Sequence, residues 1–194
     1  MAAETIFGFP TRHEGDPDRV AVLLPGGGYM PARPLLHFAR AVLVRHGWSV
    51  QEIWWEPPPT SWNMDEREKW VLDRARQAVD AEQADRVLLV GKSLGTLAAP
   101  LAADRGLPAI WFTPLITLGG VLEALRRSAA PTLLVGGTHD RWWDGAAVRT
   151  LDHQYVEIPG ADHGLELGDD PVGSVQILKD VTAAVSRFVE GLRP

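Results

Sequence analysis

The sequence predicts an α/β fold: a three-layer, open and mostly parallel sheet of six to seven strands with helices on both faces. Short apolar runs rich in Val, Leu and Ile recur, bounded by Gly, Pro or Asp, which is typical of parallel strands buried on both faces. Longer stretches with helical periodicity separate these runs, and such alternation places helices on both faces of one sheet. At 194 residues, we expect a single domain over residues 1–194.

The strands and helices follow from the local pattern. We expect strands at residues 20–24, 49–54, 87–90, 109–112, 132–135 and 155–158, with residues 5–9 as a further edge strand. We expect helices at residues 35–46, 66–82, 94–103, 118–127 and 172–192. Asn63 and Glu66 suit a capping box for the second helix, and Asp170 and Pro171 suit the start of the last. Three prolines at 57–59 indicate a stiff loop between aromatic residues.

Composition excludes several classes of function. The chain has no cysteine, which rules out disulfides, thiolate-bound zinc and a cysteine nucleophile. Its net charge is −6, with no long run of like charges, so we expect neither nucleic acid nor an anionic membrane as partner. Residues 1–10 lack the basic segment and the long apolar stretch of a secretory signal peptide. No apolar run approaches the roughly 18 residues that span a bilayer. We expect a soluble, cytoplasmic protein.

The segment with the clearest chemistry is Gly91-Lys92-Ser93-Leu94-Gly95, in which a buried strand runs through Gly-x-Ser-x-Gly into a helix. This is the context in which a serine sits on a tight, strained turn and exposes its hydroxyl as a nucleophile. The N–H of Leu94, at the start of the helix, can then face a developing oxyanion. The alternative is a glycine-rich turn in which Ser93 only caps the helix.

Nucleotide binding is a competing interpretation, because Gly91-Lys92-Ser93 also matches the last three positions of the phosphate-binding loop motif Gly-x-x-x-x-Gly-Lys-Ser. That loop requires glycine at position 86, where this chain has Arg86. The three glycines at 26–28 also fail as a dinucleotide fingerprint, since Pro31 stands three residues after Gly28. They suit an early oxyanion loop better, in which Gly28 or Tyr29 supplies the second N–H.

The general base and its acid are expected after later strands. Of the six histidines, only His163 follows the last predicted strand. Asp140 follows the preceding strand, so the chain order is Ser93, Asp140, His163, with each residue at the carboxyl end of a separate strand. Asp144 and Asp162 remain competitors for the acid, although Asp144 is better placed to begin a helix and Asp162 is adjacent to the histidine.

Together these residues resemble the α/β-hydrolase superfamily, and the chain is similar to its small, cap-free dienelactone-hydrolase-like and carboxylesterase members. The resemblance covers the chain from about Val20 onwards and implies Ser93 as nucleophile, Asp140 as acid and His163 as base. Pro25 stands where the family often has a histidine before its glycines. Dienelactone hydrolases use a cysteine nucleophile, so their substrate is not carried over.

The expected function is therefore cleavage of a small ester or related acyl substrate through an acyl-enzyme, without a metal or organic cofactor. An acyl thioesterase or acyltransferase, and a non-catalytic binding protein of the same fold, are the alternatives; the oligomeric state is not predicted. Only one helix separates residues 112 and 132, where a lid is usually inserted, so we expect an open site. Several tryptophans are candidates for its wall or for plain core: Trp54, Trp55, Trp62, Trp142 and Trp143.

Overall fold

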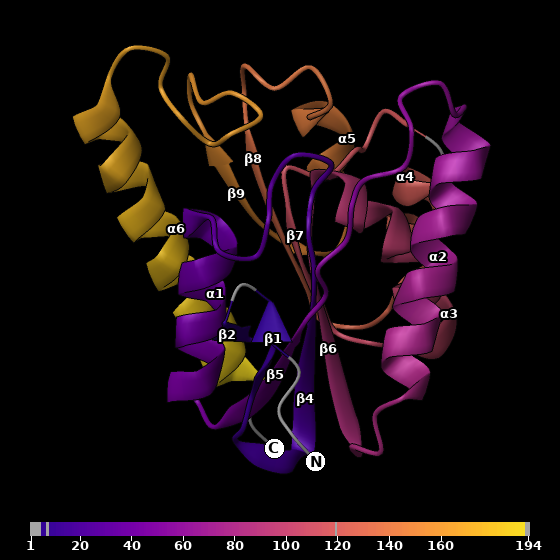
Figure 1. Cartoon of the computed structure of the whole chain (residues 1–194). Helices are drawn as coiled ribbons and strands as arrows, with labels where there is room; N and C mark the ends of the chain where they lie inside the picture. The colour runs from indigo at the N-terminus through magenta and orange to yellow at the C-terminus, as the bar shows by residue number, and fades with distance from the viewer. Residues whose placement is uncertain (1–4, 7, 119, 193–194) are drawn as a thin grey trace.

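The computed structural model describes residues 5–6, 8–118 and 120–192, and in these residues a seven-stranded sheet forms the centre of the molecule (Figure 1). The strands lie in the order β3, β5, β4, β6, β7, β8, β9. All neighbours are parallel except β3, which runs antiparallel to β5. Their bounds are β3 Arg12–His13, β4 Asp16–Leu24, β5 Trp48–Glu52, β6 Arg86–Lys92, β7 Ala109–Phe112, β8 Thr132–Gly137 and β9 Gln154–Ile158.

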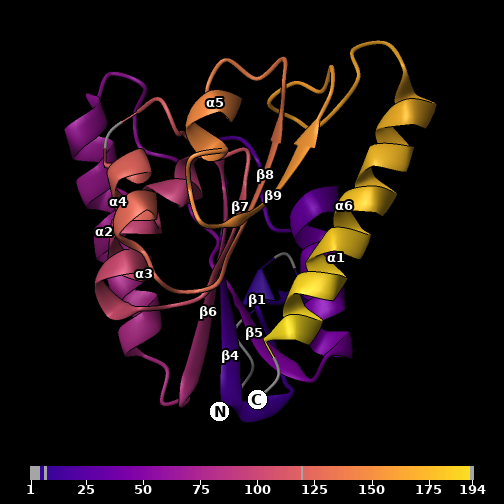
Figure 2. The same cartoon turned by 180° about the vertical axis from the view of Figure 1, so that it is seen from behind.

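Helices cover both faces of the sheet, as the two opposite views show (Figures 1 and 2). One face carries α1 (Pro34–Arg45) and α6 (Pro171–Gly191), and the other carries α2 (Met64–Asp80), α3 (Ala99–Arg105) and α4 (Val121–Arg127). Successive residues of β4 alternate between the two cores: Ala21 and Leu23 pack toward α1, whereas Val20, Val22 and Leu24 pack toward α2. A continuous apolar strand thus serves two cores at once, which confirms the predicted three layers.

The N-terminal expectation of one edge strand over residues 5–9 is wrong. Thr5–Ile6 (β1) and Phe9–Pro10 (β2) instead pair antiparallel in a separate two-stranded sheet; Phe7 lies outside the described residues. Gly8, with φ +80°, turns the chain between them. One edge strand of the main sheet is β3, which is only two residues long and too short to leave a hydrophobic pattern in the sequence.

The six core strands and the five helices are confirmed, with local differences. The segment expected as one helix over 94–103 begins as a 3₁₀ helix, η1 (Ser93–Ala98), and becomes α3 at Ala99. Pro100 explains the break, because proline has no N–H and clashes with the carbonyl four residues back. The helix expected from residue 118 begins at Val121, and Gly119 lies outside the described residues.

Polar caps fix several helix starts. Asn63 and Glu66 form the predicted capping box of α2, and the Asp170 side chain accepts from Gly173 N–H at the start of α6. A short helix that the sequence analysis did not list, α5 (Gly145–Val148), is capped by Asp144. In the described part of the chain, no helix combines the length and apolar character needed to cross a bilayer.

Candidate active site

Ser93 lies at the sharp junction of β6 and η1, at the carboxyl edge of the sheet. Its φ of +51° is rare for a residue with a side chain and holds the hydroxyl clear of the strand. Two glycines make this turn possible. A Cβ on Gly91 would lie 2.6 Å from the ring of Trp111, and one on Gly95 would collide with the carbonyl of Leu24. The sequence motif therefore has a steric cause on both sides of the serine.

Three predicted residues meet in one hydrogen-bonded line. His163 Nε2 lies 2.7 Å from Ser93 Oγ, and His163 Nδ1 lies 2.7 Å from Asp140 Oδ2. The Asp140 side chain is fully buried, whereas the His163 side chain is 36% exposed and faces the open edge. The other carboxylate oxygen of Asp140 accepts from Trp142 N–H at 3.0 Å, which fixes the orientation of the acid.

The competing acids have other partners. Asp144 accepts from Ala147 N–H at 3.0 Å as the cap of α5. Asp162 is exposed and accepts from Gly164 N–H at 2.7 Å and from Glu166 N–H at 3.1 Å within its own turn. The geometry therefore brings Asp140, and neither competitor, to the histidine ring.

Leu94 and the early glycine loop both lie beside the serine. Leu94 is the second residue of η1, where the backbone N–H has no acceptor within the helix. From the early loop, Gly26 comes nearest, since a Cβ there would lie 3.5 Å from Ser93 Cβ; its own N–H donates to the Tyr29 carbonyl. Gly27 follows beside the Leu94 side chain, whereas a Cβ on Gly28 would meet nothing within 4 Å. Gly27 thus joins Gly28 and Tyr29 as a candidate donor.

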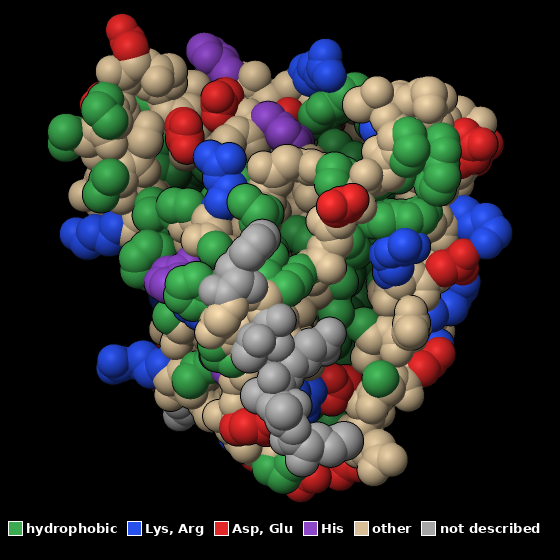
Figure 3. Space-filling model, viewed as in Figure 1, with side chains coloured by type: hydrophobic (Ala, Val, Ile, Leu, Met, Phe, Trp, Pro, Cys, Tyr) green, Lys and Arg blue, Asp and Glu red, His purple; other side chains and the backbone are tan. Residues whose placement is uncertain are grey.

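An apolar cavity of about 520 Å³ opens beside this loop. The loop residues 25–31 form one side of it, and Trp54 and Trp55 form another. Trp55 is held in place by its indole N–H, 3.4 Å from the Gly26 carbonyl, and by edge contact with Trp70. Hydrophobic side chains gather on the corresponding face between the α1 and α2 sides of the molecule (Figure 3).

The tryptophans after β8 have different surroundings. Trp143 is only 9% exposed; its ring packs against Gly136 and its indole N–H donates to Glu157 at 2.7 Å. Trp142 is half-buried, with the Arg141 guanidinium 4.3 Å from its ring centre. The cavity beside the glycine loop is lined by neither, and Trp143 belongs to the core.

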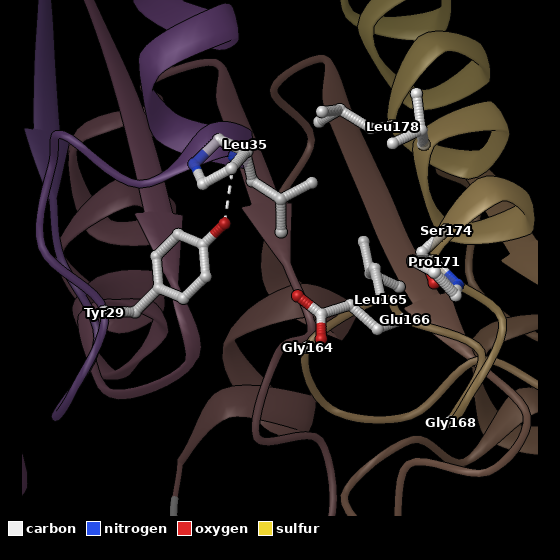
Figure 4. Close-up of a pocket in the computed structure, with 11 residues that line it drawn as sticks. Tyr29, Leu35, Gly164, Leu165, Glu166, Gly168, Pro171, Ser174 and Leu178 are labelled. Atoms are coloured by element: carbon white, nitrogen blue, oxygen red, sulfur yellow. Dashed lines mark hydrogen bonds between the residues drawn. The ribbon is translucent and has the colours of Figure 1, made fainter.

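A second hollow, of about 280 Å³, lies on the other side of Tyr29 (Figure 4). It is bordered by the loop that follows His163 and by the start of α6. The Tyr29 hydroxyl accepts from Leu35 N–H at 2.9 Å, and burial raises the pKa of this phenol. Tyr29 therefore stands as a fixed partition between an apolar cavity and a hollow that contains the carboxylate of Glu166.

Lys92, the residue before Ser93, was not predicted to take part in the site. It is 2% exposed, and its Nζ donates to Thr113 Oγ1 at 2.6 Å and to the backbone carbonyl of His163 at 2.8 Å. Burial lowers the pKa of Lys92 to about 8, although Asp140 and Asp162 act in the opposite direction. The sequence signal for such a role was a lysine that directly follows the buried apolar run of residues 87–90 and Gly91.

This buried amine makes stability depend on pH. The unfolded chain keeps Lys92 protonated up to its ordinary pKa of 10.5, whereas the folded protein releases the proton near 8. Between these values the unfolded state binds more protons, so the free energy of unfolding rises with pH. We expect wild type to gain about 2 kcal/mol relative to Lys92→Met between roughly pH 7 and pH 9.5. Urea unfolding of both proteins at each pH measures this, and parallel curves would contradict it.

Among the described residues, no group of three or more His, Asp or Glu side chains is arranged to hold a metal ion. The groups that the geometry brings together are the serine hydroxyl, the imidazole, the carboxylate and nearby backbone N–H groups. A serine hydroxyl in line with an imidazole and a buried carboxylate is the arrangement of nucleophilic acyl transfer.

No protein-family model and no curated protein sequence matches the chain. Solved structures do match its fold. The lidless α/β serine hydrolase XC6422 from Xanthomonas campestris superposes with a TM-score of 0.67 at 19% identity, over 94% of this chain and 88% of that one. Est1E from Butyrivibrio proteoclasticus, solved with ferulic acid, gives 0.67 at 15% identity over 93% of both chains. The Pyrococcus furiosus esterase Pf2001 gives 0.65 at 15% identity, over 89% and 82%. The chain thus has the α/β-hydrolase fold, and its fold neighbours include a lidless serine hydrolase.

Proposed function

We propose that the chain is a serine hydrolase that cleaves a small ester or related acyl substrate through an acyl-enzyme intermediate. The observation that carries the proposal is the line from Ser93 through His163 to Asp140, with both hydrogen bonds at 2.7 Å. This line joins residues from the ends of three different strands and has no evident packing purpose, since Ser93 and His163 are both partly exposed.

In the proposed reaction, His163 Nε2 takes the Ser93 proton as Oγ attacks the acyl carbonyl. Asp140 stabilises the imidazolium, and the tetrahedral oxyanion accepts hydrogen bonds from Leu94 N–H and from an N–H of residues 27–29. The imidazolium then gives its proton to the leaving alcohol. Water, deprotonated by the same imidazole, attacks the acyl-enzyme and releases the carboxylic acid together with free Ser93.

The cavity between the glycine loop and Trp55 suits the acyl group. Its volume of about 520 Å³ lies within the usual range for small-molecule sites, and its wall is mostly apolar with two indole rings. The neighbour Pf2001 is described as an esterase, which supports the choice of an ester over other acyl substrates.

Labelling with a fluorophosphonate probe tests the proposal. We expect stoichiometric modification at Ser93, located by mass spectrometry, and turnover of a small activated ester by the same preparation. Absence of both would indicate a non-catalytic binding protein of this fold. Labelling with product formed only when an alcohol or amine acceptor is added would indicate an acyltransferase instead.

We expect activity to decline with acyl length, from acetate and butyrate esters to palmitate, without a rise when the substrate aggregates. The physical reason is that the described residues place only α4 and its flanking loops between β7 and β8, where a lid would be inserted, and long chains need a deep, covered tunnel. Nitrophenyl esters measured below and above their aggregation threshold provide the test. An optimum at palmitate would contradict the expectation.

Trp55→Ala should raise KM for the preferred ester, with Phe38→Ala on α1, 42% exposed, as the matched control.

A further inference from the structure

We propose that Lys92 is a positioning residue, whose buried ammonium ties the backbone of His163 to strand β7 and so holds the imidazole against Ser93. The inference rests on the proposed function, because it assigns a role within the same triad. Lys92 has its hydrogen bonds to Thr113 and to the backbone of His163, and it acts on the reaction through the histidine.

The contacts place Lys92 at the crossing point of the site's loops. It ends β6, directly before the nucleophile, and its ammonium bonds the carbonyl of His163 itself rather than a neighbour's. The second acceptor, Thr113 Oγ1, follows β7 directly. The ammonium also lies 5.1 Å from the ring centre of Tyr29, on the glycine loop. One cation thus joins the nucleophile turn, β7, the histidine loop and the oxyanion loop.

Thr113 is itself held in an unusual conformation. Its φ is +41°, which is a genuine outlier for a β-branched residue, and its side chain is fully buried. Its N–H donates to the Val135 carbonyl of β8 at 2.7 Å, so the hydroxyl that accepts from Lys92 is fixed to the sheet. Such strain persists only where the surroundings impose it, and it is concentrated at functional sites.

Packing alone does not explain a lysine at this position. Burying an ammonium costs desolvation, and within the described residues Lys92 forms no salt bridge that offsets it. A methionine has similar volume and would fill the space without that cost. What only the ammonium supplies is a pair of charge-assisted hydrogen bonds to Thr113 and His163, which are roughly twice as strong as neutral ones.

The charged and titratable groups around the ammonium set its pH range. Asp140 after β8 and Asp162 after β9 favour the charged form, whereas burial and Arg33 oppose it; the ring of Tyr29 and the triad residues His163 and Ser93 complete its surroundings. With a pKa of about 8, the Lys92 amine is mostly protonated at pH 7 and mostly uncharged above pH 8. Activity should then fall above pH 8 while stability rises over the same interval, two effects of opposite sign from one proton.

The first test compares kinetics of Lys92→Met with wild type at neutral pH. We expect kcat to fall on the order of 10²-fold with KM little changed, because the imidazole loses its alignment while the acyl cavity is untouched. Lys179→Met, which removes an exposed lysine on α6, is the matched control and should keep wild-type kcat. Wild-type kcat in Lys92→Met would overturn the positioning role while leaving the proposed function intact. Inactive, unlabelled wild type would instead refute the proposed function itself.

The absence of cysteine in the sequence allows a chemical rescue. Lys92→Cys, alkylated with 2-bromoethylamine while unfolded and then refolded, carries an ammonium on a side chain as long as lysine. We expect it to recover most of the lost kcat, whereas the same variant alkylated with iodoethane should stay as slow as Lys92→Met. Equal activity of the two adducts would overturn the proposal.

The pH profile of kcat provides a further test. Wild-type kcat should decline as pH rises through about 8, and the decline should be absent in Lys92→Met. A wild-type kcat that stays level to pH 10, with stability rising as expected, would show that the charge on Lys92 is irrelevant to catalysis.

Discussion

Ser93→Ala is expected to abolish hydrolysis of small activated esters, with kcat falling on the order of 10³-fold or more. In the proposed mechanism, the hydroxyl at 2.7 Å from His163 Nε2 forms the acyl-enzyme, and no other described serine lies in that line. What rate remains would come from the oxyanion donors and the cavity alone.

The same variant should stay folded. Alanine meets no new contact at the exposed edge, and it tolerates a φ of +51° no worse than serine does. We expect the free energy of unfolding to change by less than about 1 kcal/mol, the net value of one hydrogen bond. Initial rates with a nitrophenyl ester, together with urea unfolding, measure both effects. Ser61→Ala, at an exposed loop position, is the matched control. Substantial turnover in the Ser93 variant would remove this residue from the mechanism.

Asp140→Asn is expected to lower kcat by about 10²- to 10⁴-fold while the fold survives. The structure gives a specific reason. One carboxylate oxygen accepts from Trp142 N–H, so the asparagine must place its amide oxygen there. Its NH₂ group then faces His163 Nδ1, which can only accept, and the proton of the neutral imidazole moves to Nε2. In that tautomer the histidine cannot take the proton of Ser93.

Asp144→Asn is the matched comparison, because it makes the same chemical change four residues away. Asparagine caps a helix as well as aspartate does, so α5 keeps its bond to Ala147 N–H and both activity and stability should stay near wild type. Rates over a range of substrate concentrations separate kcat from KM for both variants. A nearly inactive Asp144 variant beside a nearly normal Asp140 variant would mean that the acid has been misassigned, although Ser93 and His163 could stand.

The main elements could be predicted because parallel strands buried on two faces leave continuous apolar runs, as in residues 87–90. The triad could be placed for a related reason. Parallel strands end at one edge of a sheet, so Ser93, Asp140 and His163 share that edge, and they meet because β6, β8 and β9 lie within four consecutive strands of the sheet. The two-residue strands near the N-terminus leave no such periodic pattern, and their pairing depends on the turn at Gly8.

The sequence could not predict which tryptophan side chains point into the core and which line the cavity. Trp54 and Trp55 follow β5 much as Trp142 and Trp143 follow β8, so position alone could not separate them. Contacts made after folding do so: Gly136 leaves room for the ring of Trp143 to enter the core, whereas Trp55 rests on the glycine loop. The bond from Lys92 to the His163 carbonyl spans 71 residues of sequence and follows no local rule.

The position of β9 has a consequence for how the protein acquires its site. His163 follows the strand at one border of the sheet, and α6, which comes after it, packs against α1 near the start of the chain. The contact between α6 and α1 joins distant parts of the sequence, and such contacts are slow to form because closing a long loop costs entropy. A polypeptide emerging from the ribosome can build the nucleophile turn early, yet the imidazole reaches Ser93 only when the last strand and helix have docked. The time course with which activity returns during refolding would then report when the whole sheet is complete.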